Sequence, residues 1–489
     1  MKKKLGLAIL SVAMLSVTSC GTQINNAKGS TWDLKPLAEK YDDGTSSGSS
    51  TVELEKTGRN ATVASSFTEN SYTVTFQSTM GHELQKVITD RLVDGKYLPG
   101  FDGSVSGSPR IEVKLTTVGN YDALRESVIT NIPTGGQPDL AFCYPDHIAL
   151  YNQAGVVAHL DNFIESEEGF ASSIASNFYV EGAAFGDGHM YSLPFAKSTE
   201  ALYYNADFFN SEEAKNAGIT KVPTTWDEMW DTCGKILSIK PSSIPLGIDS
   251  ESNLFIELAK QYGFGYTNTE GKFDFNNESA KTMIQGLANQ YLTNGYFTTQ
   301  TLYGSYTSSL FSSKTDEKCY MCIGSTGGAQ YQYSADFETG VTLIPQAGEG
   351  GTNAVISQGP SVCMFEKGEQ QNKATWELIK FLLSKDVQIA YAQQSGYIPA
   401  LKAAQEDTTY VSKIDADAKQ KTKAGVIAKA QKQSLAQMPY YFVSPAFVGS
   451  STARTEVGSI ITKVLGNQRT IDQAFEEAIA ECEYAARAE

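Results

Sequence analysis

Apolar positions between residues 72 and 153 recur first with a period of two and then with helical spacing. Each run of period two predicts a β-strand, and each stripe at helical spacing predicts an amphipathic helix. Strand and helix in turn, at this spacing, predict a parallel α/β sheet. The expected strands cover 72–76, 111–115 and 139–144, and the expected helices cover 84–92, 124–132 and 148–153.

Polar and aromatic residues stand where these strands end. Open parallel sheets bind ligands beyond the carboxyl ends of their strands, so we expect 78–81, 118–121 and 144–147 to share one rim of a cleft. The glycine-rich stretch 94–109 interrupts the alternation and is expected to be an insertion loop.

The rest of the chain continues the same mixture of elements. Thr225 and Glu228 stand at the ends of a capping-box sequence, T-W-D-E, which predicts a helix start. Strong amphipathic helices are expected at 372–383 and 471–485, with a turn at 396–399. No segment repeats at a fixed period, which argues against a solenoid. Because 489 residues exceed what one hydrophobic core usually supports, at least two lobes are expected.

The N-terminus has the pattern of an export signal. Three lysines precede a short apolar run, and V-T-S-C at 17–20 resembles the lipobox of bacterial lipoproteins. We expect 1–19 to be removed as a signal peptide and Cys20 to carry the lipid that holds the protein on the outer face of the cell membrane. A freely secreted protein is the alternative. Residues 20–71 are rich in Ser, Thr and Gly and are expected to form a flexible tether.

Charge argues against nucleic acid as a partner. The formal net charge is -16, and removal of 1–19 would delete three lysines and no acidic residue, which lowers it to -19. The lysines spread over 419–432 have no aromatic residues between them and are expected to form a solvated helix face.

Six cysteines remain besides Cys20. Cys319 and Cys322 match C-x-x-C, but in the strand expected there they would face opposite sides, which disfavours a disulfide or a shared metal ion. Buried free thiols are the expected state. Pairing between distant cysteines stays open, with fifteen connectivities.

The usual signatures of catalysis and cofactor binding are missing. No pair of the four histidines has metal-ligand spacing, and the chain has neither a G-x-S-x-G elbow nor a phosphate-binding loop. We therefore expect no metal, no cofactor and no enzymatic activity. A glycosidase needs only two carboxylates, however, and among 55 acidic residues such a pair stays open.

Four residues suit the binding of a sugar. Aromatic rings stack on pyranose faces, and carboxylates accept hydrogen bonds from hydroxyl groups. Tyr121, Asp146, Trp226 and Tyr397 have this chemistry near expected strand ends and turns. Each also has a structural alternative: Trp226 in a core, Tyr397 packing a turn, and Asp146 capping its helix.

Five short segments stand in a fixed order along the chain: YTVTF (72–76), GQPDL (136–140), YSLP (191–194) with LYYN (202–205), PTTWDE (223–228) and SGYIP (395–399). Together they cover nearly everything after the expected tether. This ordered set resembles the family 1 extracellular solute-binding proteins of ABC importers, a family that includes maltose-binding and sn-glycerol-3-phosphate-binding proteins.

The resemblance implies a two-lobed periplasmic-binding-protein-like fold that closes on its ligand by hinge motion. It implies an N-terminal lobe of 72–195 plus 355–396 and a C-terminal lobe of 196–354 plus 397–489. The stretch PFAKSTEALYYNADFF (194–209) would make the first crossing between lobes. One of its two tyrosines would pack in the core.

The resemblance also implies site residues. The expected ligand contacts are Tyr121 after the second strand, Asp146 on sugar hydroxyls, Ser198 on the crossing segment, Trp226 in the T-W motif, Ser325 in a glycine-rich turn, Gly359 through its backbone, Tyr397 in the G-Y-x-P turn, and Arg454 on a late helix. Arg454 is of particular interest because a guanidinium grips phosphate or sugar hydroxyls in fork geometry.

These observations favour a monomeric, lipid-anchored receptor that captures a sugar, oligosaccharide or related polyol and delivers it to a membrane permease. An sn-glycerol-3-phosphate or polyol-phosphate receptor is the alternative within the family. A surface glycoside hydrolase and a lipoprotein adhesin are the alternatives from other classes.

Overall fold

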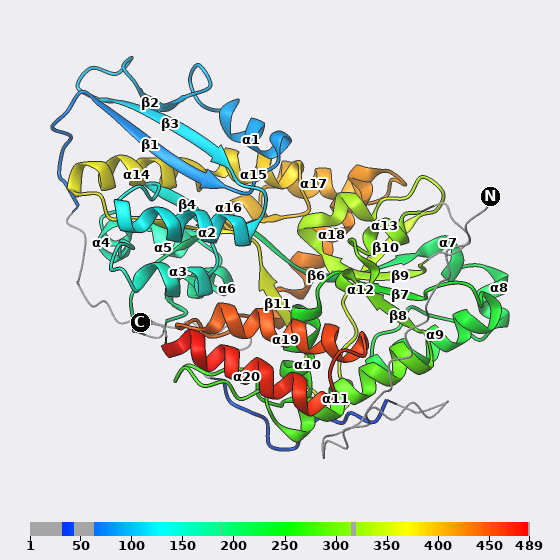
Figure 1. The fold of residues 1–489 in the computed structure, drawn as a ribbon. Helices are drawn as coiled ribbons and strands as arrows, with labels where there is room; N and C mark the ends of the chain where they lie inside the picture. The colour runs from blue at the N-terminus through cyan, green and yellow to red at the C-terminus, as the bar shows by residue number, and fades with distance from the viewer. Residues whose placement is uncertain (1–31, 44–62, 186, 314–318, 488–489) are drawn as a thin grey trace, which may run out of the picture.

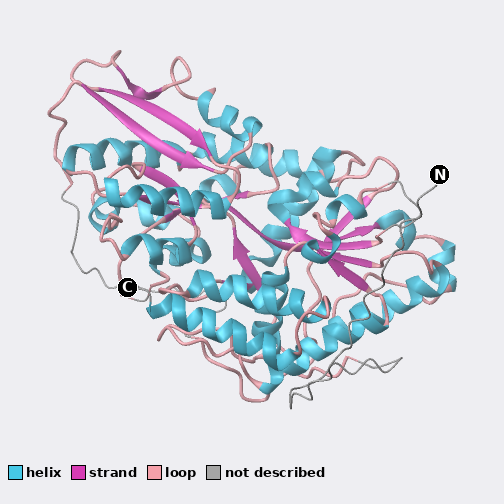
Figure 2. Cartoon of the chain, viewed as in Figure 1, coloured by secondary structure: helices cyan, strands magenta, loops and turns pink. Residues whose placement is uncertain are grey.

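The computed structural model describes residues 32–43, 63–185, 187–313 and 319–487. Within them the chain forms two lobes, each with its own sheet and hydrophobic core (Figures 1 and 2). This is the two-lobed α/β architecture that the sequence predicts.

The first sheet has strand order β2-β3-β1-β4-β12-β5. Strands β1, β3 and β4 run parallel, as expected from their alternation with helices. Strand β12 pairs antiparallel with β4, and β5 pairs antiparallel with β12. The strands are β1 (Ser71–Ser78), β2 (Tyr97–Asp102), β3 (Arg110–Thr117), β4 (Leu140–Cys143), β5 (Leu193–Pro194) and β12 (Ser361–Met364). Strand β2 lies inside 94–109, so the expected insertion loop is partly a strand.

Helices pack around this sheet and bury its apolar side chains in one core. They are α1 (His82–Thr89), α2 (Tyr121–Asn131), α3 (Pro145–Asn152), α4 (Asp161–Glu165), α5 (Phe170–Ser173), α6 (Ser176–Tyr179), α14 (Glu369–Leu382) and α15 (Lys385–Gln393). Parallel strands end at the same edge, so the starts of α2 and α3 lie at one rim.

The second sheet has strand order β14-β11-β6-β9-β7-β8, with β10 and β13 also paired to β6. The strands are β6 (Ala196–Asn205), β7 (Leu246–Ile248), β8 (Phe297–Thr299), β9 (Met321–Ser325), β10 (Thr339–Thr342), β11 (Val355–Gln358), β13 (Ile398–Pro399) and β14 (Tyr441–Phe442). The residues expected to form a turn at 396–399 thus end in the short strand β13.

Besides α14 and α15, the helices that follow β6 in the described ranges are α7 (Ala206–Phe209), α8 (Glu212–Asn216), α9 (Trp226–Ile239), α10 (Glu251–Tyr262), α11 (Glu278–Ala288), α12 (Gln300–Tyr303), α13 (Ser308–Phe311), α16 (Lys402–Gln405), α17 (Thr408–Asp417), α18 (Lys423–Gln437), α19 (Ser450–Leu465) and α20 (Ile471–Arg487). The predicted helix start is confirmed, since the Thr225 side chain accepts a hydrogen bond from the backbone N–H of Glu228 at the start of α9. The Glu228 carboxylate accepts from the backbone N–H of Thr224, one residue before the cap.

Within the described ranges the chain changes sheets at three places. Strand β5 leads directly into β6, Gly359 and Pro360 join β11 to β12, and helix α15 leads into β13. The division predicted at residue 355 precedes β11, which belongs to the second sheet, so the sheets change at Gly359 instead.

A buried ion pair lies where these segments meet. Lys197 Nζ is 2.5 Å from Glu181 Oε2, and their side chains are 1% and 4% exposed. The same Nζ donates to the carbonyl of Gly359 at 2.9 Å, and the Ser357 hydroxyl donates to Glu181. The Lys197 ammonium group therefore connects β6 both to the 3-10 turn at Val180–Ala183 and to the link between β11 and β12.

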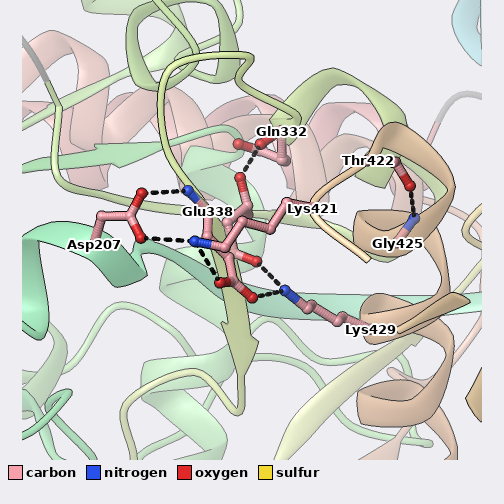
Figure 3. A network of polar contacts seen from close by, with 8 residues as sticks. Asp207, Gln332, Glu338, Lys421, Thr422, Gly425 and Lys429 are labelled. Carbon is pink, nitrogen blue, oxygen red and sulfur yellow. Dashed lines mark hydrogen bonds and ion pairs between the residues drawn. The ribbon is translucent and has the colours of Figure 1, made fainter. Parts of the chain in front are cut away.

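The lysine-rich segment at 419–432 is paired with acids rather than simply solvated. Lys429 lies 2.7 Å from Glu338, while Lys421 lies 3.2 Å from Glu338 and 3.3 Å from Asp207 (Figure 3). These contacts connect α18 and the loop before it to the segment that leads into β10. Their partners neutralise part of the basic patch.

The six cysteines at 143, 233, 319, 322, 363 and 482 are buried free thiols. Burial raises the pKa of Cys319 and of Cys482 to about 12. They behave as small apolar side chains, as expected.

The expected tether is wrong for residues 32–43. Trp32 is buried in the core of the second lobe, where it packs over Gly286 and lies 5.5 Å from the ring of Trp230. Its indole N–H donates to the Tyr262 hydroxyl at 3.0 Å. The backbone N–H groups of Leu37 and Tyr41 also donate to carbonyls at the end of α10.

We predict that Trp32→Ala lowers the free energy of unfolding by about 3–5 kcal/mol, the usual cost of removing a large buried aromatic side chain. Urea unfolding followed by fluorescence measures this change. Leu37→Ala, at a position 37% exposed, is the control and should cost less than about 1 kcal/mol. Equal stability of Trp32→Ala and the parent protein would show that this segment is not part of the folded lobe.

Candidate ligand-binding site

A cavity of about 300 Å³ lies between the two lobes. Helices α2 and α3 of the first lobe border it on one side, and α19 of the second lobe faces them (Figure 1). Its lining comprises Tyr121, Asp122, Arg125, Tyr144, Pro145, Asp146, His147, Ser252, Tyr266, Ile356, Ser357, Gln358, Val443, Ser444, Pro445, Ser450, Ser451, Arg454 and Thr455.

Helix starts position the first-lobe wall. The side chain of Asn120 caps α2 by accepting from the N–H of Ala123 at 2.8 Å, which places Tyr121 in the first turn. Pro145 occupies the first position of α3, where a missing N–H costs nothing, and Asp146 follows it. The carboxylate of Asp146 accepts from the N–H of His147 at 3.1 Å.

Tyrosines form the aromatic part of this wall. The rings of Tyr121 and Tyr144 have centroids 4.7 Å apart, and Tyr121 shares hydrogen bonds with Thr79, Tyr144 and Tyr397 through its hydroxyl. Burial raises the pKa of Tyr121 and Tyr144 well above the usual value, so both phenols stay neutral donors. Burial also lowers the pKa of His147, which keeps its ring neutral.

The second-lobe wall is built on a close contact between two helices. A Cβ on Gly458 of α19 would lie 2.5 Å from the Ser252 hydroxyl of α10, so this approach requires glycine. Arg454 of α19 donates to the side-chain oxygen of Asn253 on α10, and Asn253 donates in turn to Glu200 on β6. Gln358 Nε2 donates to the same Glu200 oxygen at 2.9 Å.

Buried carboxyl groups stand behind Arg454. Burial raises the pKa of Glu200 to about 7, although hydrogen bonds from Asn253 and Gln358 lower it. Burial also raises the pKa of Glu257 well above its usual value, and the charge of Glu200 adds to that effect. Burial therefore favours a state in which at least one of the two carboxyl groups, Glu200 or Glu257, is protonated.

One hydrogen bond crosses the cavity directly. Arg125 Nη1 donates to the Ser451 hydroxyl at 2.7 Å, which joins α2 of the first lobe to α19 of the second. The same guanidinium lies 3.3 Å from the Asp122 carboxylate. The two lobes thus touch at the site itself.

The structure brings together three of the predicted site residues. Tyr121, Asp146 and Arg454 all line the cavity. Tyr397 lies behind this wall, hydrogen-bonded to Tyr121 and packed against the ring of Tyr391 with centroids 6.0 Å apart. It supports Tyr121 from behind.

Four other predicted residues lie outside the cavity lining. Trp226 is 1% exposed in the second-lobe core, and its indole N–H donates to Gln261 at 2.9 Å. Ser198 is 1% exposed on β6, with its hydroxyl 3.5 Å from that of Ser325. Ser325 caps the N–H of Gly327 at 3.2 Å.

Gly359 also lies outside the cavity lining, in a tight link between two strands. Its φ is +90°, and a Cβ there would lie 2.1 Å from the carbonyl of Ala196. Its own carbonyl is occupied by Lys197. A residue with a side chain could not make this link between β11 and β12.

Several lining residues escaped the sequence prediction. Arg125 lies one helical turn after Tyr121, so the period of α2 could have placed both on one face. Tyr144 stands within the predicted rim. Tyr266, Gln358 and Ser451 carry no local signal, because only the packing of the second lobe against the first brings them here.

Two lobes, three chain crossings and a polar, aromatic cavity between the lobes define a solute-binding protein. Residues 105–424 match the family model of the bacterial extracellular solute-binding proteins, and the chain belongs to that family. The resemblance inferred from the ordered segments is thereby confirmed.

Similarity to individual proteins agrees with this assignment. The chain is 29% identical over 235 residues to the sn-glycerol-3-phosphate-binding periplasmic protein UgpB of Brucella melitensis, across 45% of this chain and 52% of that protein.

Two solved structures share the fold. UgpB from Mycobacterium tuberculosis in complex with glycerophosphocholine superposes with a TM-score of 0.68 at 17% identity, over 85% of this chain and 98% of that one. The cyclic alpha-maltosyl-1,6-maltose binding protein from Arthrobacter globiformis superposes with a TM-score of 0.65 at 16% identity, over 86% and 100%.

We predict that the stability of the protein falls as the pH rises from about 4.5 to about 7, because of Glu200. Below 4.5 this carboxyl is protonated in both the folded and the unfolded chain. Between 4.5 and 7 only the folded chain keeps the proton, and above 7 the folded chain buries the charge. Glu200→Gln should therefore match the parent near pH 4 and exceed its free energy of unfolding at pH 8 by on the order of 3 kcal/mol.

Denaturant unfolding at a series of pH values measures this difference. Glu481→Gln, at an exposed position of α20, is the control and should follow the parent profile. Parallel profiles for Glu200→Gln and the parent would rule out Glu200 as the titrating group.

Proposed function

We propose that this protein is the ligand receptor of an ABC importer and that it captures a neutral carbohydrate in the cavity between its lobes. The observation that carries the proposal is the balance of charge in the lining. Two guanidinium groups, Arg125 and Arg454, face two carboxylates, Asp122 and Asp146, while His147 is neutral. A lining with no excess of either charge favours a neutral ligand with many hydroxyl groups over an ion.

The hydrogen-bonding groups of the lining also suit a sugar. Carboxylates accept from hydroxyls, guanidinium groups donate to them, and tyrosine and serine do both. The rings of Tyr121, Tyr144 and Tyr266 supply flat apolar surface for pyranose faces. A volume of about 300 Å³ lies at the lower end of the range for small-molecule sites, about 300–1,000 Å³, which favours a mono- or disaccharide.

A polyol phosphate is the second candidate. Arg454 could grip a phosphate in fork geometry, and a quaternary ammonium such as that of glycerophosphocholine could lie on the rings of Tyr121 and Tyr144. The similarity to UgpB supports this candidate. The carboxylates of Asp122 and Asp146 oppose it, because they repel a phosphate.

A glycoside hydrolase is not favoured. The chain belongs to a family of binding proteins, and Asp122 is 3.3 Å from Arg125, which holds it as an ion-pair partner rather than as a free acid or base.

We further propose that the protein functions as a monomer on the outer face of the membrane, held there by lipid on Cys20. The signal sequence and Cys20 lie outside the described residues, so the support is the V-T-S-C sequence and the extracellular character of the family. Among the helices within the described ranges, none has the length and apolar character needed to cross a bilayer.

Metabolic labelling with a fatty acid tests the anchor. We predict that the parent protein incorporates the label and that Cys20→Ala does not, because the thiol is the acylation site. Cys482→Ala, which removes a buried thiol of α20, is the control and should label normally. Label retained by Cys20→Ala would contradict lipidation at this position.

A thermal-shift screen with glucose, maltose, maltotriose, sn-glycerol-3-phosphate and glycerophosphocholine tests the ligand class. Calorimetry then measures the affinity of the sugar that gives the largest shift. We predict that Arg454→Gln and Asp146→Asn each weaken binding about 10- to 100-fold, because each removes a charged hydrogen-bonding partner.

Arg469→Gln is the matched control, since Arg469 pairs with Glu477 on the exposed surface and should leave the affinity unchanged. Unchanged affinity in both cavity variants would refute the proposed site. A shift with the two phosphates and none with the sugars would replace the carbohydrate by a polyol phosphate. Cleavage of maltose or maltotriose by the pure protein would favour the hydrolase.

A further inference from the structure

Two histidines and one aspartate gather in the first lobe, away from the ligand cavity. His159, Asp161 and His189 each offer one ligand atom, and these three atoms all lie within 4.8 Å of one another. None of the three residues lines the cavity between the lobes. We propose that they form a binding site for a divalent transition-metal ion, with Zn²⁺ as the ion best suited to it.

The fold holds the two parts of this cluster together. The N–H of Leu160 donates to the carbonyl of Met190 at 2.8 Å, so the segment that carries His159 and Asp161 runs beside the segment that carries His189. The N–H of Met190 in turn donates to the Asp161 carboxylate at 3.3 Å. The three side chains are thus positioned by backbone contacts and do not depend on an ion to meet.

The distances fit a tetrahedral ion. His189 Nδ1 lies 3.3 Å from Asp161 Oδ2. Bonds of about 2.0–2.1 Å at tetrahedral angles place two ligand atoms about 3.3–3.5 Å apart. The His159 and His189 rings have centroids 4.4 Å apart, and the His159 ligand atom lies within 4.8 Å of the other two.

The ligand types select the class of metal. Imidazole nitrogens favour Zn²⁺ and its first-row neighbours, whereas Ca²⁺ and Mg²⁺ prefer sites made of oxygen atoms. Three protein ligands leave the fourth position of a tetrahedral ion for water.

The surroundings keep the cluster dry on one side. His189 is 4% exposed and Asp161 is 9% exposed. The ring of Tyr191 lies 4.8 Å from that of His159, and Phe185 packs on Tyr191. The Tyr191 hydroxyl and the backbone N–H of His189 both donate to the Asp187 carboxylate, and these hydrogen bonds fix the loop that carries His189. Such an outer layer of contacts orients metal ligands.

A pocket of about 430 Å³ borders the cluster on the side of Asp161. Its lining includes Asp161 together with Glu165, Glu167 and Glu168, but neither of the two histidines. Carboxylates raise the local concentration of cations. An ion would therefore meet the cluster from the side of its carboxylate.

Such an ion would act on the hinge and leave the ligand contacts untouched. His189 lies four residues before β5, and β5 leads directly into the crossing strand β6. A metal bond from His189 to His159 and Asp161 would hold this segment against the first lobe. Sequence spacing gave no sign of the site, because the two histidines are far apart in the chain and meet only in the fold.

Calorimetric titration of ZnCl₂ into the EDTA-stripped full chain, without a histidine tag and without sugar, tests the proposal. We expect one ion per chain and a rise in melting temperature of about 3 °C at a hundredfold excess over the dissociation constant. Asp161→Asn and His189→Gln should each weaken binding at least about 10-fold, because each removes one ligand atom.

His82→Gln is the matched control. His82 is an exposed histidine with Glu83 3.5 Å away, so it represents a surface pair that binds zinc weakly if at all. Binding that survives in both cluster variants, or that is lost in His82→Gln, would overturn the proposal.

A second measurement covers variants that fail to fold. Co²⁺ bound to the parent protein should give the intense visible d–d bands of a tetrahedral site, and one equivalent of Zn²⁺ should abolish them. The absence of these bands, or their persistence in excess Zn²⁺, would equally overturn the site.

Discussion

The contact between Lys197 and Glu181 is the constraint on which the two-lobed arrangement depends. Both charges are buried, and burial of an ion pair costs so much hydration that such a pair adds little net stability. Its value lies in position. Lys197 also holds the carbonyl of Gly359, so the first two chain crossings are fixed to each other at one atom. Replacement by apolar side chains would keep the volume and lose this alignment.

The ligand cavity depends on that alignment because its two walls belong to different lobes. Tyr121 and Asp146 follow from strand ends of the first sheet, whereas Arg454 comes from a helix packed on the second. Behind Arg454, hydrogen bonds lead through Asn253 to Glu200 on the crossing strand β6. The guanidinium is thus connected to the hinge strand, so a change in hinge angle and a change in the position of Arg454 are mechanically linked.

The sequence was informative where function follows from local order. Parallel strands end at one edge, so Tyr121 and Asp146 could be placed at the rim from periodicity alone, and Arg454 came from the family resemblance. Periodicity could not place Trp226, which lies in the core of the second lobe, because an aromatic residue in a capping-box sequence fits a core as well as a cleft. The prediction of a flexible tether was wrong for 32–43, because this segment is polar apart from a few residues and the contacts of Trp32 are with residues more than 190 positions later. Contacts between distant segments leave no local pattern.

The docking of residues 32–43 sets how far an anchored receptor can reach. If lipid holds Cys20, only about 12 residues separate the membrane from the folded second lobe, in place of the roughly 50 expected of a free tether. At about 3.3–3.6 Å per residue, this shortens the maximum distance between the lipid and the folded part from about 180 Å to about 40 Å. The attachment point would then lie on the second lobe. An anchored receptor would rotate about that lobe close to the bilayer, and the first lobe would move through the larger arc.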